Sequence, residues 1–179
     1  MYKLKPLMVK VGMCTVNNGS LDFKKNYERI MESIRRCKEQ GCKIRVGTEL
    51  EIPGYGCYDH FKEYDTINHS WEIVAEIIKS GITQDILVDL GMPILHHGNI
   101  YNSRVILWNS KVIGIRPKII LADGDVYFET RWFGFWKEKG KIAEFKLPRA
   151  IQEANGQKRV PIGEFLIELN DTCLGFEIC

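Results

Sequence analysis

Three residues of the sequence have side chains that together could attack a carbonyl carbon. Glu49 and Lys118 each follow a short apolar run, and Cys179 ends another such run. A thiolate is the nucleophile, a nearby cation lowers the pKa of the thiol, and a carboxylate accepts its proton. The ammonium group can then stabilise the oxyanion that forms on the attacked carbonyl. The alternative interpretation is a surface carboxylate, a solvated lysine and a small buried thiol.

The spacing of apolar residues predicts the elements that must bring these three side chains together. Residues 7–16 are apolar and rich in β-branched side chains, which predicts a buried strand. Residues 23–37 repeat apolar side chains at helical spacing, and Gly41 closes the predicted helix. Residues 44–48 predict the next strand and complete a β-α-β unit with parallel strands. Reacting groups in such sheets gather beyond the carboxyl ends of the strands, which is where Glu49 lies.

The remaining elements are predicted from the same patterns of apolar and turn-forming residues. In chain order they are a helix around 71–78, a strand over 86–95, a turn at 96–99, a hairpin of 101–108 and 111–116 around Asn109 and Ser110, a loop-rich stretch over 122–161, and two last strands at 165–169 and 174–179.

The composition is that of one globular domain, or of part of a larger one, in the α/β class. Of 179 residues, 45% are hydrophobic and 27% are charged, and the formal net charge is +2. The near-neutral charge argues against binding to nucleic acid or to an anionic membrane. No apolar stretch approaches the roughly 18 residues of a membrane-spanning helix, and no signal peptide is recognisable. The six cysteines are too sparse for a disulfide scaffold, so we expect reduced thiols and a cytoplasmic protein.

Three short segments resemble the motifs of the nitrilase, or carbon–nitrogen hydrolase, superfamily. Residues 48–55 (TELEIPGY) resemble its glutamate motif, residues 116–121 (RPKIIL) its lysine motif, and residues 175–179 (GFEIC) its cysteine motif. Thr48 departs from this pattern, because the superfamily usually has a proline at that position. The resemblance implies amide hydrolysis and a four-layer αββα sandwich, of which this chain holds only the N-terminal part.

Carried over to the matching positions, the resemblance assigns a role to each of the three residues. Glu49 is then the general base, Lys118 the electrostatic stabiliser and Cys179 the nucleophile. Glu129 matches a second acidic position, which lies near the lysine in the superfamily and helps to order the site. The other interpretation of Glu129 is a surface carboxylate beside Arg131.

The wider sequence is similar to the N-terminal glutaminase domain of the eukaryotic glutamine-dependent NAD⁺ synthetase family. The similar segments are residues 47–60, 80–85, 131–133 and 147–149. This resemblance implies that residues 1–179 are an incomplete hydrolase domain with glutamine as its substrate. In that family the released ammonia reaches a synthetase domain of the same chain, which uses ATP and Mg²⁺ to convert deamido-NAD to NAD⁺. The hydrolase domain itself needs no cofactor, and we expect the full-length protein to form a homo-oligomer.

The position of Cys179 at the end of the sequence leads to a further expectation. In the nitrilase superfamily the residue after the cysteine supplies a backbone N–H to the oxyanion hole. Loss of one oxyanion donor typically lowers the rate by about 10²–10³. We therefore expect the 179-residue chain alone to be inactive, with the synthetase domain absent from it.

Several other side chains have both a functional and a structural interpretation. Tyr55 and Tyr58 follow the glutamate motif and are candidates for the wall of the substrate pocket. Glu51 lies two residues from Glu49, so in an extended segment the two carboxylates would form a pair with one raised pKa. Alternatively, Glu51 forms a structural ion pair. The aromatic stretch 132–136 either contacts a ligand or a subunit, or packs beneath a long loop.

The sequence predicts no metal site. Cys57 with His60 and His69, and His96 with His97, are side chains of the types that bind metals. Their spacings match no recognised zinc pattern, so we assign no metal to them.

Two other functions stay open. A free-standing nitrilase-family ω-amidase would apply the same chemistry to small ω-amides, although residues 56–60 resemble the synthetase branch. The third interpretation is a noncatalytic truncated isoform, which the end of the sequence at Cys179 favours.

Overall fold

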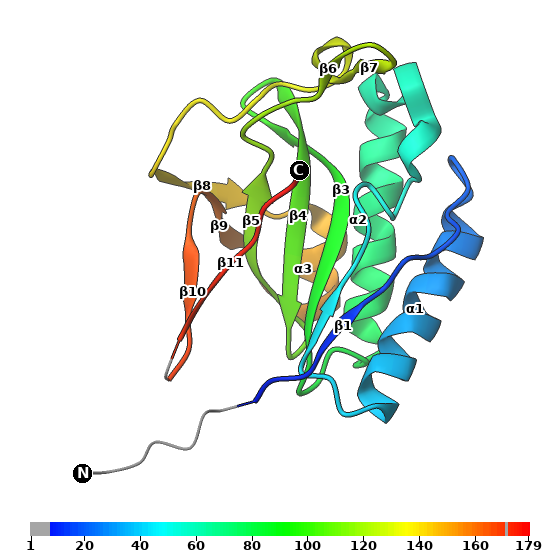
Figure 1. Ribbon diagram of the computed structural model, residues 1–179, viewed down its shortest axis with the longest axis vertical. Coiled ribbons are helices and arrows are strands. Elements are labelled where there is room, and N and C mark those ends of the chain that lie inside the picture. The colour runs from blue at the N-terminus through cyan, green and yellow to red at the C-terminus, as the bar shows by residue number, and fades with distance from the viewer. Residues whose placement is uncertain (1–7, 171) are drawn as a thin grey trace.

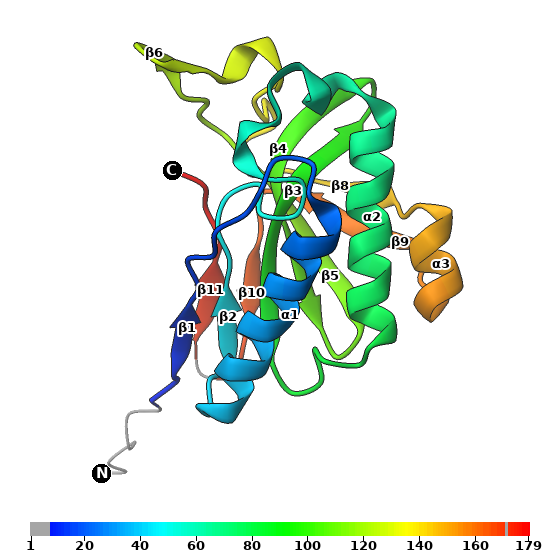
Figure 2. The same cartoon turned by 90° about the vertical axis from the view of Figure 1, so that its right-hand side faces the viewer.

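The structure is a computed structural model that describes residues 8–170 and 172–179. It consists mainly of one mixed sheet, with helices on one face and a two-stranded ribbon on the other (Figures 1 and 2). The elements of the described residues are, in chain order, β1 (Val11–Met13), α1 (Phe23–Glu39), β2 (Ile44–Val46), the 3₁₀ segment η1 (Tyr55–Lys62), α2 (Tyr64–Lys79), β3 (Leu87–His96), β4 (Asn99–Trp108), β5 (Lys111–Pro117), β6 (Asp123–Gly124), β7 (Tyr127–Phe128), the 3₁₀ segment η2 (Glu129–Arg131), β8 (Ile142–Lys146), α3 (Arg149–Asn155), β9 (Arg159–Gly163), β10 (Leu166–Glu168) and β11 (Cys173–Gly175).

The main sheet has the strand order β1-β2-β3-β4-β5-β9-β8. Strands β1, β2 and β3 are parallel, β4 is antiparallel to both of its neighbours, and β5 is parallel to β9. β2 and β5 therefore run in the same direction, although β3 and β4 separate them. Their carboxyl ends lie at the same end of the sheet, and Glu49 and Lys118 follow them there.

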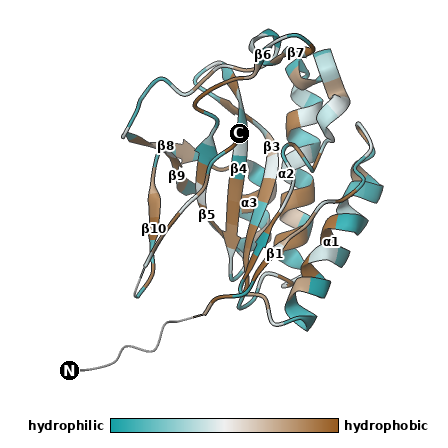
Figure 3. Cartoon of the chain, in the orientation of Figure 1, coloured by the Kyte–Doolittle hydropathy of each residue, from teal (hydrophilic) through white to brown (hydrophobic). Residues whose placement is uncertain are grey.

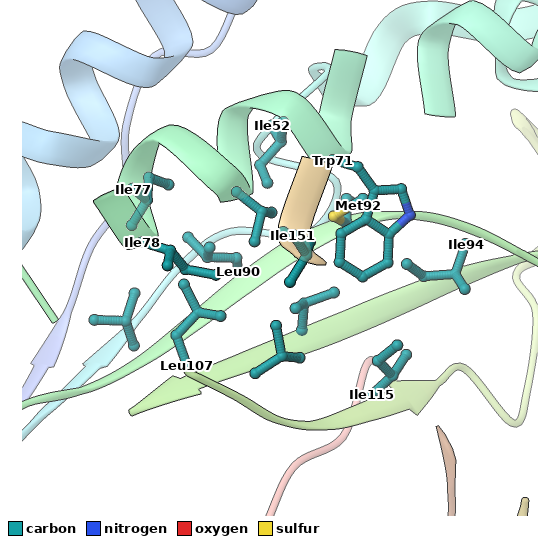
Figure 4. Close-up of a cluster of buried hydrophobic side chains, with 14 of the residues drawn as sticks. Ile52, Trp71, Ile77, Ile78, Leu90, Met92, Ile94, Leu107, Ile115 and Ile151 are labelled. Carbon is teal, nitrogen blue, oxygen red and sulfur yellow. The ribbon is translucent and has the colours of Figure 1, made fainter. Parts of the chain in front are cut away.

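The three α-helices pack on one face of the sheet around the main hydrophobic core. Trp71 of α2 and Ile151 of α3 are buried against alternate residues of the central strands, including Leu90 of β3 and Leu107 of β4 (Figure 4). Ile34 of α1 is fully buried in the same cluster. Because successive side chains of a strand point to opposite faces, the same strands present a different set of residues on the other side.

That other face has an apolar half and a polar half. Ile44, Leu87 and Ile106 form an apolar cluster, against which Leu174 and Phe176 of the C-terminal segment pack. Figure 3 shows the hydrophobic colour along β4 and β10, which contribute to this contact. Toward the carboxyl ends of β2 and β5, polar side chains of β3 and β4 replace the apolar ones, and these are Asp89, Asn102 and Arg104.

Helix α1 confirms the helix predicted over residues 23–37. The side chain of Asp22 caps its first turn by accepting a hydrogen bond from the backbone N–H of Lys25. Ile30, Ile34 and Cys37 repeat at helical spacing and are all buried. Gly41 follows the helix with a φ of 75°, a conformation that glycine adopts without strain.

Both predicted turns around β4 are confirmed. β3 and β4 are joined by His97 and Gly98, which have φ values of 47° and 78°. β4 and β5 are joined by Asn109 and Ser110, which have φ values of 47° and 60°. Positive φ at both central residues gives the tight turn whose twist matches that of antiparallel strands.

The prediction of a buried strand over residues 7–16 is wrong in length and in burial. Only Val11–Met13 form β1, and Val11 and Met13 are 46% and 86% exposed. Among the described residues, β1 is an edge strand whose one neighbour is β2. Leu7 lies outside the described residues. An apolar run identifies a strand, but the run does not reveal whether the strand lies at the centre or at the edge of the sheet.

The loop-rich stretch predicted over residues 122–161 contains regular structure. β8 and β9 pair with each other and extend the main sheet beyond β5, and α3 connects them. These elements are only five to seven residues long. In windows this short, periodicity is weak, and Pro161 within β9 resembles a strand breaker.

The last two strands are shorter than predicted. β10 ends at Glu168 and β11 ends at Gly175, so Cys179 lies beyond its strand and not at the end of it. In the part of the chain that the structure describes, the two strands pair with each other, as an antiparallel ribbon over the apolar half of the sheet.

Candidate active site

Glu49 and Lys118 meet at the end of the sheet where β2 and β5 finish. The Nζ atom of Lys118 lies 2.8 Å from Oε1 of Glu49. The two residues are 69 positions apart in the sequence, and the strand order alone brings them together. Lys118 is 1% exposed, whereas the Glu49 side chain is 25% exposed, so the carboxylate is the member of the pair that solvent or a substrate can reach.

Glu129 joins the same cluster from η2. Lys118 Nζ lies 3.0 Å from Oε1 and 2.9 Å from Oε2 of Glu129. The backbone N–H of Ala122 donates a hydrogen bond of 2.6 Å to Oε2, which fixes the carboxylate from the other side. Glu129 is 3% exposed, so the interpretation of this residue as a surface carboxylate is wrong.

The charge of Lys118 is maintained by its two carboxylate partners. Burial alone would lower the pKa of this ammonium group, because a buried charge loses its hydration. The hydrogen bonds and negative charges of Glu49 and Glu129 outweigh that effect and raise the pKa of Lys118 above its ordinary value. Lys118 therefore stays a cation at neutral pH.

A fourth member of the cluster, Asn102 of β4, was not identified from the sequence. Its Nδ2 group donates hydrogen bonds to Oε1 of Glu49 and to Oε1 of Glu129. Its backbone carbonyl accepts a hydrogen bond of 2.8 Å from the N–H of Lys118. A polar residue within the apolar strand 101–108 is the signal that could have pointed to it, although the sequence alone does not name its partners.

The turn that carries Glu49 is held by Arg104 of β4. The guanidinium group donates hydrogen bonds of 2.9 Å to the carbonyl oxygens of Gly47 and Thr48, the two residues before Glu49. It also forms a bidentate pair with Asp89, with both distances 2.7 Å. Bidentate arginine–carboxylate pairs fix geometry as well as charge. The backbone of the turn is therefore tied to β3 and β4.

Glu51 holds the same turn from the helix side of the sheet. Arg45 of β2 donates hydrogen bonds of 2.6 and 2.8 Å to the two carboxylate oxygens of Glu51. Arg45 also donates to Ser33 of α1, and both members of the ion pair are fully buried. The interpretation of Glu51 as a structural ion pair is confirmed. The alternative, in which Glu49 and Glu51 form a pair of carboxylates, is wrong because both oxygens of Glu51 accept hydrogen bonds from Arg45.

Cys179 is exposed and lies on the opposite face of the sheet from the helices. Both views show the C-terminal end of the chain on the side of β10 and β11, toward the end of the sheet where β5 finishes (Figures 1 and 2). Arg116 anchors the segment before Cys179 by donating 3.0 Å to the carbonyl of Phe176 and 2.6 Å to Glu177. Arg116 lies two positions before Lys118. The residue that holds the C-terminal segment is therefore near one member of the buried cluster in the sequence. Among the hydrogen bonds of residues 8–170 and 172–179, none involves the Cys179 thiol.

Tyr55, at the end of the glutamate motif, and Tyr58, three residues later, have different surroundings. Burial, followed by the negative charges of Glu49 and Glu129, raises the pKa of Tyr55. Tyr55 is 48% exposed. Tyr58 is 68% exposed, and its ring meets the edge of the Trp132 ring at a centroid distance of 5.9 Å.

The aromatic stretch 132–136 contributes mainly to packing. Phe133 and Trp136 are 5% and 4% exposed, and Phe135 is 48% exposed. The backbone N–H of Trp136 donates to the carbonyl of Lys118, which ties this stretch to the site.

Within the described part of the chain, no three His, Cys, Asp or Glu side chains are grouped in a way that could hold a metal ion. No helix there has the length and apolar composition that a membrane span requires.

Comparison with known proteins gives a consistent result. The family model described as carbon–nitrogen hydrolase matches residues 10–179. The chain is 46% identical over 171 residues to a glutamine-dependent NAD(+) synthetase of Mus musculus, and 45% identical over 172 residues to one of Saccharomyces cerevisiae. Each match covers 96% of this chain and 24% of the relative, so the chain spans about a quarter of the length of these relatives.

Solved structures agree with this assignment. A glutamine-dependent NAD(+) synthetase from Cytophaga hutchinsonii superimposes with a TM-score of 0.80 at 30% identity, over 96% of this chain and 28% of that one. An amidase from Nesterenkonia sp. superimposes with a TM-score of 0.64 at 14% identity, over 78% of this chain and 52% of that one. The second match shows a shared fold alone. The predicted α/β architecture of the nitrilase type is thereby confirmed.

Proposed function

The chain belongs to the carbon–nitrogen hydrolase family, and from that premise we propose that it hydrolyses the side-chain amide of glutamine. The observation that carries the proposal is the 2.8 Å hydrogen bond between Lys118 Nζ and Glu49 Oε1. It joins two residues of separate motifs in a buried, charged cluster at the carboxyl ends of parallel strands. The names of the relatives, which are glutamine-dependent enzymes, support the choice of substrate.

The first step of the proposed reaction forms a thioester. The Cys179 sulfur attacks the amide carbon of glutamine as Glu49 accepts the thiol proton. Lys118 stabilises the negative charge on the carbonyl oxygen, and Glu129 holds Lys118 in place. The C–N bond then breaks, and Glu49 returns the proton to the departing nitrogen, so that ammonia leaves. The acyl group remains bound to sulfur.

The second step releases glutamate. Glu49 accepts a proton from water, and the oxygen of that water attacks the thioester carbon. The C–S bond breaks, and the thiol of Cys179 regains its proton from Glu49. The product is a carboxylic acid, which loses its remaining proton to solvent and leaves as a carboxylate. The 25% exposure of the Glu49 side chain supports this role, because water must reach its carboxylate.

The wider role is proposed from the relatives, of which this chain spans about a quarter. Residues 1–179 would act as a hydrolase unit that supplies ammonia to a synthetase domain of the same polypeptide. That domain would use ATP and Mg²⁺ to amidate deamido-NAD, whereas amide hydrolysis would need no cofactor. Tyr55 and Tyr58, both exposed, would line the entrance for glutamine. The full-length protein would form a homo-oligomer.

Substitution of Cys179 tests the proposal, with Cys173 as a matched control because both thiols are exposed. In the whole natural polypeptide that carries these residues, Cys179→Ala should abolish glutamine-dependent NAD⁺ formation and ammonia release. It should spare the reaction driven by added ammonium, because that reaction needs no nucleophilic thiol. Cys173→Ala should keep both activities, since Cys173 lies in β11 and has no assigned role.

The outcomes separate the alternatives. Full glutamine-dependent activity of Cys179→Ala would remove Cys179 from the mechanism. Preference of the wild type for short aliphatic amides over glutamine would favour the ω-amidase, and no hydrolysis of either substrate would favour the noncatalytic isoform.

A further inference from the structure

Asn102 occupies the centre of the charged cluster and has no role in the function proposed so far. It is fully buried, and its amide nitrogen carries two hydrogens, one for each of its carboxylate partners. Its backbone carbonyl holds the N–H of Lys118. One residue thus contacts the proposed base, its stabilising lysine and the second carboxylate. The orientation of the amide is fixed by chemistry, because the flipped form would place Oδ1 against two negative oxygens.

The charges of the cluster explain why a neutral donor is needed at this position. Glu49 and Glu129 are negative and Lys118 is positive, so the three groups together keep one net negative charge. A lysine or arginine at position 102 would cancel that charge and make Glu49 a poorer proton acceptor. An aspartate would place a third carboxylate beside two others. The amide group donates to both carboxylates and leaves the net charge unchanged.

The other end of the same amide group has no compensating interaction. Oδ1 of Asn102 is buried and accepts no hydrogen bond from the described residues. A buried acceptor without a partner typically costs about 1–3 kcal/mol. A purely structural position would favour an apolar side chain of similar shape, which avoids this cost. The hydrogen bonds from the N–H groups of Asn102 to the two carboxylates explain why a polar side chain is kept here despite this cost.

We propose that Asn102 is a positioning residue for glutamine hydrolysis, which holds Glu49 against Lys118 and preserves the carboxylate as a proton acceptor. The proposal rests on the function proposed above. The charged and titratable groups that face Asn102 are Glu49 from the turn after β2, Lys118 after β5 and Glu129 of η2. Burial, followed by the negative charges of Glu49 and Glu129, raises the pKa of Tyr55 of η1.

The decisive variant is Asn102→Asp, which replaces the two-proton donor with a carboxylate of nearly the same shape. The pH profile of kcat/KM for glutamine is measured on the whole natural polypeptide. A third carboxylate makes ionisation of the cluster harder, so the acidic limb should move to higher pH by about one unit. At its optimum, kcat should fall about 10- to 100-fold, a part of the 10²–10⁴ that a positioned general base contributes. KM should stay nearly constant.

The control is Asn99→Asp, the same substitution at the exposed first residue of β4. Its pH profile should overlap that of the wild type. If the acidic limb of Asn102→Asp also overlaps the wild type, the proposal is overturned. If Asn102→Asp does not fold, as judged by circular dichroism, Asn102→Ser decides, because the small hydroxyl cannot bridge both carboxylates. Its kcat should then fall at constant KM, and an unchanged kcat would overturn the proposal.

Failure of this inference can be told apart from failure of the proposed function. A wild-type protein that releases no ammonia from glutamine would contradict the proposed function itself. An active wild type whose profile is insensitive to the substitution of Asn102 would contradict only the positioning role.

Discussion

Two arginine–aspartate pairs near the candidate site have the same bidentate geometry but opposite surroundings. Arg104 and Asp89 are joined by two hydrogen bonds of 2.7 Å, and their side chains are 5% and 3% exposed. Arg131 and Asp59 are joined at 2.7 and 2.8 Å, and their side chains are 58% and 60% exposed. The first pair lies within the sheet, and the second lies in solvent.

Each pair holds a different part of the site. Arg104 fixes the turn that carries Glu49 through the carbonyls of Gly47 and Thr48. Asp59 of η1 and Arg131 of η2 join the two segments that carry Tyr55 and Glu129. An ion pair in solvent is screened and contributes little to stability, whereas loss of one partner in a buried pair leaves an uncompensated charge.

The difference indicates a division of tasks. The proposed base is fixed from within the sheet, where a misplacement of about 1 Å would cost activity. The segments that carry Tyr55 and Glu129 are joined by a pair in solvent, which contributes little to stability. The proposed base is therefore held by buried ion pairs, whereas the segments of the proposed entrance are joined by an exposed one.

The largest contrast is expected between Arg104→Ala and Arg131→Ala. Removal of Arg104 leaves Asp89 buried without its cation, which should lower the free energy of unfolding by about 3–5 kcal/mol. Removal of Arg131 should leave the free energy of unfolding unchanged within error, because both partners face solvent. Urea denaturation followed by circular dichroism measures both values. Equal losses for the two variants would show that burial does not distinguish the pairs.

A smaller effect is expected from Gly91→Ala in β3. A Cβ atom at this position would collide with the backbone of Thr48 and Leu50 and lie 3.0 Å from Arg104. Backbone atoms cannot rotate away, so the substitution should destabilise the protein by about 1–3 kcal/mol. Gly134→Ala is the control, because its Cβ would have its nearest neighbour at 3.7 Å. Thermal unfolding compares the two, and a Gly91 variant as stable as the Gly134 variant would contradict the close approach of the turn.

The smallest effect is expected from titration of the exposed pair. Hydrogen bonds from Arg131 and from the indole N–H of Trp132 hold the pKa of Asp59 well below its usual value of 3.8. Because the folded pKa is depressed, the contribution of this pair is complete above the unfolded pKa and is lost as pH falls through the folded pKa. The indole N–H signal of Trp132 in NMR spectra should therefore stay constant from neutral pH down past 3.8.

The control for this titration is Asp59→Asn, in which the same signal should show no titration of the pair at any pH. A wild-type transition centred near the ordinary aspartate value would show that Arg131 and Trp132 do not protect the carboxylate.

Much of the fold could be predicted because its signals are local. The helix over 23–37 follows from apolar spacing, and the hairpin turn at Asn109 and Ser110 follows from turn-forming residues. β8, α3 and β9 were missed because five to seven residues give too little periodicity. The burial of β1 was overestimated because its position at the edge of the sheet depends on the other strands.

The candidate site was predictable in part. What the sequence did not reveal are the residues that contact the predicted side chains and hold them in place. The motifs singled out Glu49, Lys118 and Cys179, and the resemblance added Glu129. The structure brings Glu49, Lys118 and Glu129 into contact, whereas none of the hydrogen bonds of the described residues joins Cys179 to them. Asn102 and Arg104 carry no such signal, because one asparagine or arginine in an apolar strand has many interpretations. Their contacts depend on the pairing of β4 with β3 and β5.

The sequence by itself therefore determined which chemical groups are available, in which order they occur, and which short elements surround them. These properties depend on residue type and on spacing over a few positions, because they arise from interactions between residues close together in the sequence. Only the tertiary structure decided that Glu51 is occupied by Arg45, that Asn102 bridges two carboxylates, and that one arginine–aspartate pair is buried while the other is exposed. The strength and role of a charged group depend on which partners reach it and on how much water remains around it, and both follow from the packing of distant segments.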